Sequence, residues 1–392
     1  MTETGTDWRV LDGVATAWFA APSLTAGAAL AGRIGQLTGT AAVDLRASGV
    51  RVRLDAPRHA AAVSAAARDA GLAADPAALQ QLSVVVESAD PAAVRRFWQP
   101  VLGYAPGPDG AGLTDPLRRD PALRIRASDQ PRPLRHRVHL DVVRPAAVVE
   151  RVRPGAPSGP YGVRHGDPDG NEVDLVPGGA LGEDPATADW QAVFSAMACY
   201  RVGSPAQQRD LAAAVAALAG DAGFPLLVDL RPGLVVVDSG KDQWEADAHG
   251  LALDFTALAA DVQAAARDLG AVADPELPRF AQLFLDAADV AAVRAFWAAA
   301  LGYTPDRRAG ATDIHDPRRL DPVLVFQQLD AAETDRRRQR NRIHAELAVP
   351  ADHARARLAA AVAAGGRPLA EQAGRVRIAD PEGNELVLVS GA

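Results

Sequence analysis

Cysteine, lysine and long apolar runs are nearly missing from this chain of 392 residues. The single cysteine, Cys199, excludes an internal disulfide and a thiolate metal cluster, and its place in a predicted strand over 194–202 indicates a buried structural thiol. No apolar run is long enough to cross a membrane, and residues 1–8 are acidic and polar where a secretion signal would be basic and then apolar. We therefore expect a cytoplasmic protein without a membrane partner.

An excess of positive charge is missing as well. The formal net charge is −8 and Lys241 is the one lysine, so the chain lacks the basic surface that a phosphate backbone requires. Nucleic acid is therefore excluded as an expected partner. Arginine supplies nearly all the positive charge and alanine is abundant, a bias that genomic base composition explains as well as function does.

Short motifs recur in the same order in the two halves of the chain, at a nearly constant offset, which indicates an internal duplication. The first-half motifs are Phe97-Trp98, Leu102-Gly103-Tyr104, Asp115-Pro116, Asp120-Pro121, Arg137-Val138-His139 and Asp167-Pro168-Asp169-Gly170-Asn171-Glu172. Their counterparts are Phe296-Trp297, Leu301-Gly302-Tyr303, Asp316-Pro317, Asp321-Pro322, Arg342-Ile343-His344 and Asp380-Pro381-Glu382-Gly383-Asn384-Glu385. A hydrophobic content of 48% can build several cores, so we expect a duplicated two-domain unit joined near 177–185.

Each half begins with a module of hairpins and helices, predicted over 1–78 and 186–273. Asp12-Gly13 and Ser48-Gly49 predict hairpin turns, and a helix is expected after each hairpin, the first capped by Ser23. A second module follows over 79–179 and 279–392. It predicts a strand, a helix whose buried face carries Phe97 and Trp98, and then further strands. The predicted fold class is α+β, with the whole unit in tandem.

The motifs of the second module, in this order and present twice, resemble the glyoxalase-like and bleomycin-resistance branch of the vicinal oxygen chelate superfamily. The resemblance covers about 79–178 and 279–391. It implies a βαβββ cup in each segment that holds one small organic molecule. In the metal-using members of this superfamily, a divalent ion lies in the cup and polarises neighbouring oxygens of the substrate.

The modules that precede the cups resemble pterin-4a-carbinolamine dehydratase, by element order and by Asp-Leu-Arg hairpins that begin at Asp44 and Asp229. That family depends on a His-His-Pro motif just before this hairpin. Residues 38–41 and the tripeptide Gly223-Phe224-Pro225 hold no histidine, and His59 and His249 lie elsewhere. We expect the fold of this family without its dehydration chemistry.

Because side chains alternate along a strand, each segment can be expected to line its own cup with a defined set of residues. The expected catalytic residues are His139, Glu172, Asp174 and Arg137. The expected substrate-binding residues are Ser83, Glu87, Arg124 and Arg126 in the first segment and Gln282, Arg342, His344 and Glu385 in the second. Asp141, Asp286 and Glu346 share these faces.

The resemblance implies metal ligands at particular positions of the first segment. His139 and Asp174 match two ligand positions, whereas Ser83 stands where a further histidine would be expected. A divalent metal is thus a candidate cofactor of the first cup. The alternative is that His139 hydrogen-bonds a neighbouring carboxylate or the bound ligand without a metal.

The second segment matches this pattern less well. His344 and Gln282 suit ligand positions, but Val387 replaces the carboxylate of Asp174. Glu172 and Glu385 lie two residues earlier on the same strand faces, and each could supply the carboxylate ligand of its segment instead. We therefore expect the first cup to carry any chemistry and the second to bind a ligand or to be degenerate.

Arginines precede both histidine strands, at positions 132, 135 and 137 and again at 336, 337, 338, 340 and 342. One interpretation is a solvated basic loop, and the other is an electropositive lip that steers anionic ligands. His165 is a further candidate proton carrier.

Three functions remain open. The first is a lyase or isomerase in which His139 is the acid or base, Glu172 or Asp174 its carboxylate partner, and Arg137 the group that holds an anionic part of the substrate. The second is a protein that binds or sequesters an antibiotic or metabolite. The third, a carbinolamine dehydratase, is disfavoured by the missing motif. A small molecule is the expected ligand, and a homodimer is a candidate assembly.

Overall fold

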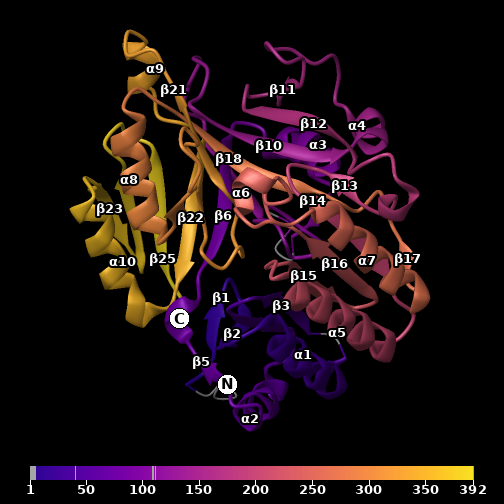
Figure 1. Ribbon diagram of the computed structural model, residues 1–392. Helices are drawn as coiled ribbons and strands as arrows, with labels where there is room; N and C mark the ends of the chain where they lie inside the picture. The colour runs from indigo at the N-terminus through magenta and orange to yellow at the C-terminus, as the bar shows by residue number, and fades with distance from the viewer. Residues whose placement is uncertain (1–5, 40, 108–109, 111, 392) are drawn as a thin grey trace. The chain divides into compact units, whose positions relative to one another are not determined.

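The computed structural model describes residues 6–39, 41–107, 110 and 112–391 (Figure 1). The chain divides into two compact units, and each unit is assembled from two separated stretches. Residues 1–79 and 178–279 form the first unit, and residues 80–177 and 280–391 form the second. The α+β fold class is confirmed, and both units combine sheets with helices. The division into four domains, over 1–78, 79–179, 186–273 and 279–392, stays a prediction.

The first unit contains one continuous sheet in the order β1-β2-β4-β3-β15-β16-β14, with short strands β5, β13 and β17 at its margins. Its strands are β1 (Arg9–Leu11), β2 (Val14–Ala20), β3 (Ala42–Arg46), β4 (Gly49–Leu54), β5 (Ala73–Ala74), β13 (Gln191–Ala192), β14 (Ala196–Arg201), β15 (Leu227–Arg231), β16 (Leu234–Asp238) and β17 (Val272–Ala273). Its helices are α1 (Leu24–Thr38), α2 (Ala60–Asp69), α5 (Pro205–Ala222), α6 (Ala246–His249) and α7 (Phe255–Asp268), with 3-10 turns at Pro57–His59, Pro76–Ala78 and Pro185–Thr187.

The two modules of the first unit join through strands β3 and β15 and through helices α1 and α5, which lie side by side (Figure 1). Local sequence explains the elements at this junction. Ser23 caps α1 by accepting from the Ala26 amide, as expected, and Gly39 ends it at a left-handed φ of 64°. Asp12 and Gly13 both have positive φ, which is the geometry that a tight hairpin requires.

Buried ion pairs cross the junction of β3 and β15. Asp44 accepts from Arg51 Nε at 2.6 Å and also bonds Arg53 and Arg231, while Asp229 bonds Arg46 at 2.8 Å. Burial alone would raise the pKa of Asp44, but the surrounding arginines hold it well below its usual 3.8. The Asp-Leu-Arg hairpins therefore hold the two modules together.

The second unit contains two sheets. One has the order β23-β24-β25-β22-β6-β9-β8-β7, and the other runs β11-β12-β10-β18-β21-β20-β19. The strands of the first segment are β6 (Gln81–Ser88), β7 (Ala105–Pro106), β8 (Gly112–Thr114), β9 (Leu123–Ala127), β10 (Val138–Pro145), β11 (Arg164–Gly166) and β12 (Glu172–Ala180). Those of the second are β18 (Phe280–Ala287), β19 (Thr304–Pro305), β20 (Ile314–His315), β21 (Leu324–Gln328), β22 (Ile343–Val349), β23 (Arg367–Gln372), β24 (Arg375–Ala379) and β25 (Glu385–Ser390).

Helices α3 (Pro91–Leu102), α4 (Ala146–Val152), α8 (Val290–Leu301), α9 (Thr334–Arg338) and α10 (Ala351–Ala363) complete this unit. The predicted buried face of α3 is confirmed for Trp98, which is fully buried and donates from Nε1 to Asp167 at 2.9 Å. Phe97 is only partly buried. Trp297 repeats the bond with Asp380 at 3.0 Å, so each Phe-Trp motif is anchored to the closing turn of its own segment.

The strands of the two segments are exchanged between the sheets of the second unit, which the sequence analysis did not anticipate. Strand β6 pairs with β22, and β18 pairs with β10, both antiparallel. Figure 1 shows β22 between β6 and β25, that is, between a strand of the first segment and one of its own. The expectation that each segment lines its own cup is therefore wrong: each sheet is completed by the other segment.

Two smaller expectations also need correction. Strand β12 continues to Ala180, so the expected joint over 177–185 begins inside a strand. The strand expected over 194–202 begins only at Ala196, because Phe194 adopts a positive φ of 61°. Cys199 is buried in this strand, as expected.

Candidate functional site

The exchange of strands brings four polar side chains together on one sheet. We call the side of the β12-β10-β18 sheet that carries His139 the His139 face. It gathers His139 and Asp141 from β10, Asp174 from β12 and Gln282 from β18. Asp141 lies opposite Gln282 in the register of β10 and β18, and His139 lies opposite Phe284.

His139, Asp141 and Asp174 form a compact group of metal-ligand type. One ligand atom from each lies within 4.8 Å of the others, and His139 Nε2 is 3.5 Å from Asp141 Oδ1. Asp141 was expected on this face but not as a ligand, although the spacing His-x-Asp on a strand signals a shared face. Glu172, expected as an alternative carboxylate, lies outside this group.

Neighbouring side chains fix the orientation of this group. Gln282 Nε2 donates to Asp141 Oδ2 at 3.0 Å, and the ring of Phe284 stacks on the imidazole of His139 at a centroid distance of 5.0 Å. His139 Nδ1, Asp174 Oδ1 and Gln282 Oε1 are buried and have no hydrogen-bond partner among the described residues. Buried polar atoms without partners cost free energy, so a ligand or metal ion that bonds to these atoms would be stabilised on this face.

Burial dominates the electrostatics of the His139 face. Burial, together with smaller effects of the nearby arginines Arg135 and Arg164, lowers the pKa of His139 to about 3. Burial also raises the pKa of Asp174, against the effect of Arg164. The imidazole is therefore neutral at physiological pH, which is the form that binds a metal.

The donor set fits a divalent ion. Imidazole nitrogen and carboxylate oxygen are common ligands of Zn²⁺ and of other first-row divalent metals. Two ligands that are each about 2.1 Å from one ion can be at most about 4.2 Å apart, so the group needs only a small contraction to bind one. Solvent reaches it mainly at Asp174, whose side chain is 21% exposed, against 7% for His139.

The equivalent face of the other sheet has different chemistry. We call the side of the β25-β22-β6 sheet that carries His344 the His344 face. Val387 stands at the position of Asp174, as the sequence showed, and Ser83 lies opposite Glu346 in the register of β6 and β22. Ser83 therefore belongs to this face and Gln282 to the His139 face, the reverse of the expected assignment by segment.

Arginines replace the metal-type group on the His344 face. Buried Glu346 accepts from Arg126 Nη2 at 2.7 Å, lies 3.7 Å from Arg124 Nε, and also bonds Arg375. In register, Val325 and Gln327 of β21 stand where β9 has Arg124 and Arg126. The two faces are thus built alike but differ in charge.

One arrangement recurs on both faces and joins the two segments. Arg340 makes paired bonds of 2.7–2.8 Å to Glu385 and of 2.7 Å to Glu87. Burial alone would raise the pKa of Glu87, but bonds from Arg340 and Arg132 lower it to about 2. The equivalent Arg135 shares its Nε–H between the two carboxylate oxygens of Glu172, at 3.0 and 2.8 Å, and lies 3.9 Å from Asp286 of the other segment. Glu87, Glu172 and Glu385 are therefore engaged with arginine.

Several other expected residues lie apart from the His139 group. Arg137 is expected to face His139, but its Nη1 donates to the carbonyl of Glu382 at 3.1 Å. Arg342 is buried and lies 3.5 Å from the carbonyl of Gln130. His165 pairs with Val173 on the opposite, apolar side of β12. His344 Nδ1 is 3.9 Å from Glu87.

The interpretation of the arginine run before β22 as a solvated loop holds only in part. Arg336 and Arg340 form ion pairs with buried acids, whereas the side chain of Arg338 is 81% exposed. Sequence reasoning missed Arg375 and Arg377 as neighbours of Glu346 and Glu385, because strand β24 had not been predicted. Their alternation on either side of Val376 was the available signal.

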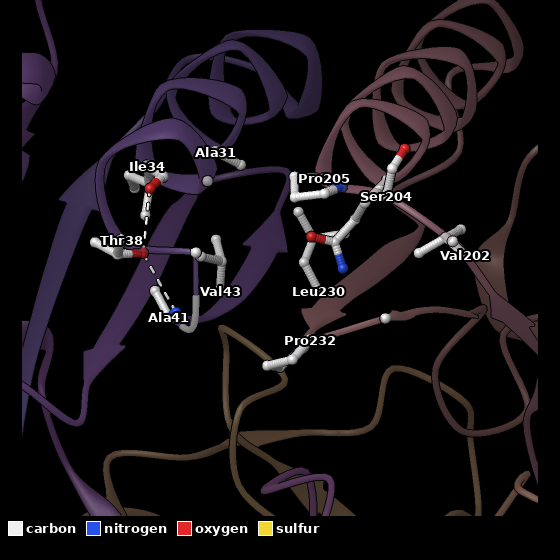
Figure 2. Close-up of a pocket in the computed structure, with 15 residues that line it drawn as sticks. Ala31, Ile34, Thr38, Ala41, Val43, Val202, Ser204, Pro205, Leu230 and Pro232 are labelled. Carbon is white, nitrogen blue, oxygen red and sulfur yellow. Dashed lines mark hydrogen bonds between the residues drawn. The ribbon is translucent and has the colours of Figure 1, made fainter.

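A cavity of about 150 Å³ in the first unit lies between the end of α1 and the start of α5 (Figure 2). It touches the window in which a dehydratase would carry its histidines. Thr38 accepts there from the Ala41 amide and donates to the Ile34 carbonyl. None of the described residues that line this cavity is charged or a histidine. The similarity of these modules to the pterin dehydratase stays a prediction, and the described lining of the cavity offers no acid or base.

Comparison with known families decides the affiliation of the second unit. The glyoxalase-like domain family matches residues 83–176 and 282–389, which together exceed half of the chain. The chain belongs to this family. The two glyoxalase-like segments are the ones that exchange strands in the second unit.

Solved structures similar to this glyoxalase-like chain include glyoxalase I from Zea mays, with 11% identity, a TM-score of 0.41, and coverage of 80% of this chain and 92% of that one. The cppA protein from Streptococcus pneumoniae is another, with 9% identity, a TM-score of 0.33, and coverage of 79% and 97%. No curated protein sequence matches the chain. Within the described ranges, no helix is long and apolar enough to cross a membrane.

Proposed function

We propose that the chain is a metal-dependent enzyme of lyase or isomerase type that acts on a small organic molecule at the His139 face. The observation that supports this most is the group His139, Asp141 and Asp174, whose ligand atoms lie within 4.8 Å of one another. The family affiliation supports action on, or binding of, a small molecule.

In this proposal His139, Asp141 and Asp174 hold the ion. When bound, a divalent ion would supply Lewis acidity that polarises oxygen atoms of the substrate. The chain's own residues provide the geometry. Gln282 holds the carboxylate of Asp141 in place, and Phe284 holds the plane of the His139 ring.

Charge beside the group is also arranged by the chain. Arg164 lies 3.9 Å from Asp174 and 3.5 Å from Glu172, and its side chain is 26% exposed. It is placed to orient an anionic part of a substrate that enters at Asp174. Both carboxylate oxygens of Glu172 accept from Arg135 Nε, so the role of Glu172 would be to position Arg135 and Arg164 rather than to transfer a proton.

Metal titration tests the proposal. Protein stripped with a chelator is titrated with Zn²⁺, Ni²⁺, Co²⁺ and Mn²⁺ by calorimetry, and metal content is checked by elemental analysis. We expect one equivalent to bind, and His139→Ala and Asp174→Ala to weaken binding at least about tenfold, or about 1.4 kcal/mol. His344→Ala is the matched control, because His344 stands at the equivalent strand position opposite Val85 rather than Phe284.

Two results would overturn the proposal. Unchanged metal affinity in His139→Ala, with folding intact, would place the metal elsewhere. Equal losses in His139→Ala and His344→Ala would show two equivalent sites. A metal that binds as expected, with tight retention of a metabolite and no turnover of it, would favour the sequestering protein over the enzyme.

A further inference from the structure

A pocket in the glyoxalase-like unit lies away from the His139 group. It has a volume of about 530 Å³, within the range of small-molecule sites. Its lining comes from the segment around α9, the start of β23, the end of β24 and the turn that leads into β25, together with Arg137. None of His139, Asp141, Asp174 and Gln282 lines it.

Arginine dominates the lining of this pocket. Five arginines line it, namely Arg137, Arg337, Arg338, Arg340 and Arg367, against two acidic residues, Glu382 and Glu385. Both carboxylates already have partners. Glu385 is held in paired bonds by Arg340, and Glu382 forms an ion pair with Arg337 at 3.7 Å and accepts from the backbone amides of Ala288 at 3.1 Å and Asp289 at 2.6 Å. Two acids against five arginines leave the lining of the pocket with an excess of positive charge.

Arg137 is the most informative of these residues because it is almost completely buried, with 1% exposure. Its one side-chain hydrogen bond among the described residues goes to the carbonyl oxygen of Glu382, at 3.1 Å, and its Nε has no partner there. Asp380 and Glu382 are the carboxylates that act on its charge, and neither forms an ion pair with it within 4 Å among the described residues. A buried guanidinium without a directly bonded carboxylate is costly, and this one lines an open pocket.

The rim of the pocket supplies further donors. Arg367 is exposed at the start of β23. The side chain of Arg338 is 81% exposed, and its Nη1 lies 3.9 Å from the exposed carboxylate of Asp335. Arg337 Nε lies 3.7 Å from Glu382 Oε2. The flat fork of N–H donors in a guanidinium matches the paired oxygens of a carboxylate or phosphate.

We propose that this pocket binds the carboxylate or phosphate group of a small organic anion, with Arg137 as the buried anchor and Arg367 at the rim. It is a second site, distinct from the proposed metal site on the His139 face and independent of it. Arg137 comes from the first segment and the rest of the lining from the second, so the site exists only in the strand-exchanged unit.

Anion titration tests this proposal. Chelator-treated protein at constant ionic strength is titrated with inorganic phosphate, pyrophosphate and succinate by calorimetry, and unfolding temperature is recorded in parallel. We expect saturable binding and a rise in unfolding temperature that exceeds the effect of chloride. The phosphate and succinate arms distinguish a phosphorylated ligand from a carboxylate ligand, since the preferred group should bind more tightly.

Variants connect the binding to the pocket. Arg137→Met and Arg367→Met should each weaken anion binding at least about tenfold, whereas Arg355→Met, an equal loss of charge on the exposed face of α10, should leave it unchanged. Arg367→Met keeps the test valid if Arg137→Met folds poorly, because Arg367 is exposed. His139→Ala should retain anion binding, so failure of the metal proposal and of this one can be told apart.

Absence of saturable binding by all three anions would overturn the proposal. So would equal weakening by Arg137→Met and Arg355→Met, since that would indicate attraction to the net charge of the surface alone.

Discussion

Arg340→Met should loosen the His344 face far more than Arg135→Met loosens the His139 face. Arg340 makes four bonds of 2.7–2.8 Å to Glu87 and Glu385, which come from different segments. Arg135 shares one donor, Nε–H, between the two carboxylate oxygens of Glu172 and is 3.9 Å from Asp286. The two arginines occupy equivalent positions, so each is the control for the other.

The pKa of Glu87 sets the magnitude of the loss. It falls from the usual 4.5 to about 2 in the folded protein, although burial opposes this, and that difference corresponds to about 3 kcal/mol of stabilisation at neutral pH. Arg132 shares the bonding of Glu87, but Arg340 also holds Glu385. We therefore expect Arg340→Met to cost about 3 kcal/mol and the more exposed Arg135→Met about 1 kcal/mol.

Hydrogen exchange of peptides from β6, β22 and β25, read by mass spectrometry, measures this loss locally and avoids the overlapping unfolding of two units. A loss of 3 kcal/mol corresponds to roughly hundredfold faster exchange where opening of this sheet limits it. Because the pKa of Glu87 is lowered, the stabilisation is complete above pH 4.5 and lost as pH falls toward 2, so variant and wild type should converge in acid. Equal protection in the two variants at neutral pH would refute the reasoning.

Three shorter predictions concern other buried groups. Asp44→Asn should destabilise the first unit by about 3–5 kcal/mol in urea unfolding, more than Asp229→Asn, because it leaves three buried guanidinium groups without their shared carboxylate. Burial lowers the pKa of His344 to about 4, so stability should fall between pH 6.5 and 4, where the unfolded chain binds the proton first, and His344→Gln should flatten that slope. Trp297→Phe should cost about 1–3 kcal/mol by leaving buried Asp380 with one donor fewer, seen as a lower unfolding temperature.

The sequence alone predicted most elements of the fold but not how they pair. Caps, turns and alternation are local signals, and they correctly indicated α3, β9 and the buried Trp98. The pairing of β10 with β18 depends on contacts between residues about 145 positions apart, such as His139 and Phe284. The alternation of side chains within one strand is the same whether that strand pairs with a strand of its own segment or with the equivalent strand of the other segment.

The same distinction explains the candidate site. His139 and Asp174 were identified by matching ligand positions of the resembled family within one segment, and they do lie together. Gln282 was assigned to the wrong face because its partner Asp141 lies in the other segment. The position of Arg137 could not be predicted either, since it follows from a single bond to the backbone of Glu382 at the end of a strand, where alternation no longer determines direction.

The interleaving of the segments has a consequence for biosynthesis. Neither compact unit is a continuous stretch of chain. Residues 80–177 can complete their unit only after residues 280–391 have been synthesised, and residues 1–79 can complete theirs only after residues 178–279. At roughly 5–20 residues per second, strand β10 leaves the ribosome roughly 7–30 seconds before β18 exists to cover its free edge. During that interval the first segment presents an unpaired strand and an incomplete apolar layer, which invites pairing with a neighbouring nascent chain. Assembly on polysomes should therefore be the step at which this architecture is most exposed to aggregation and most dependent on chaperones.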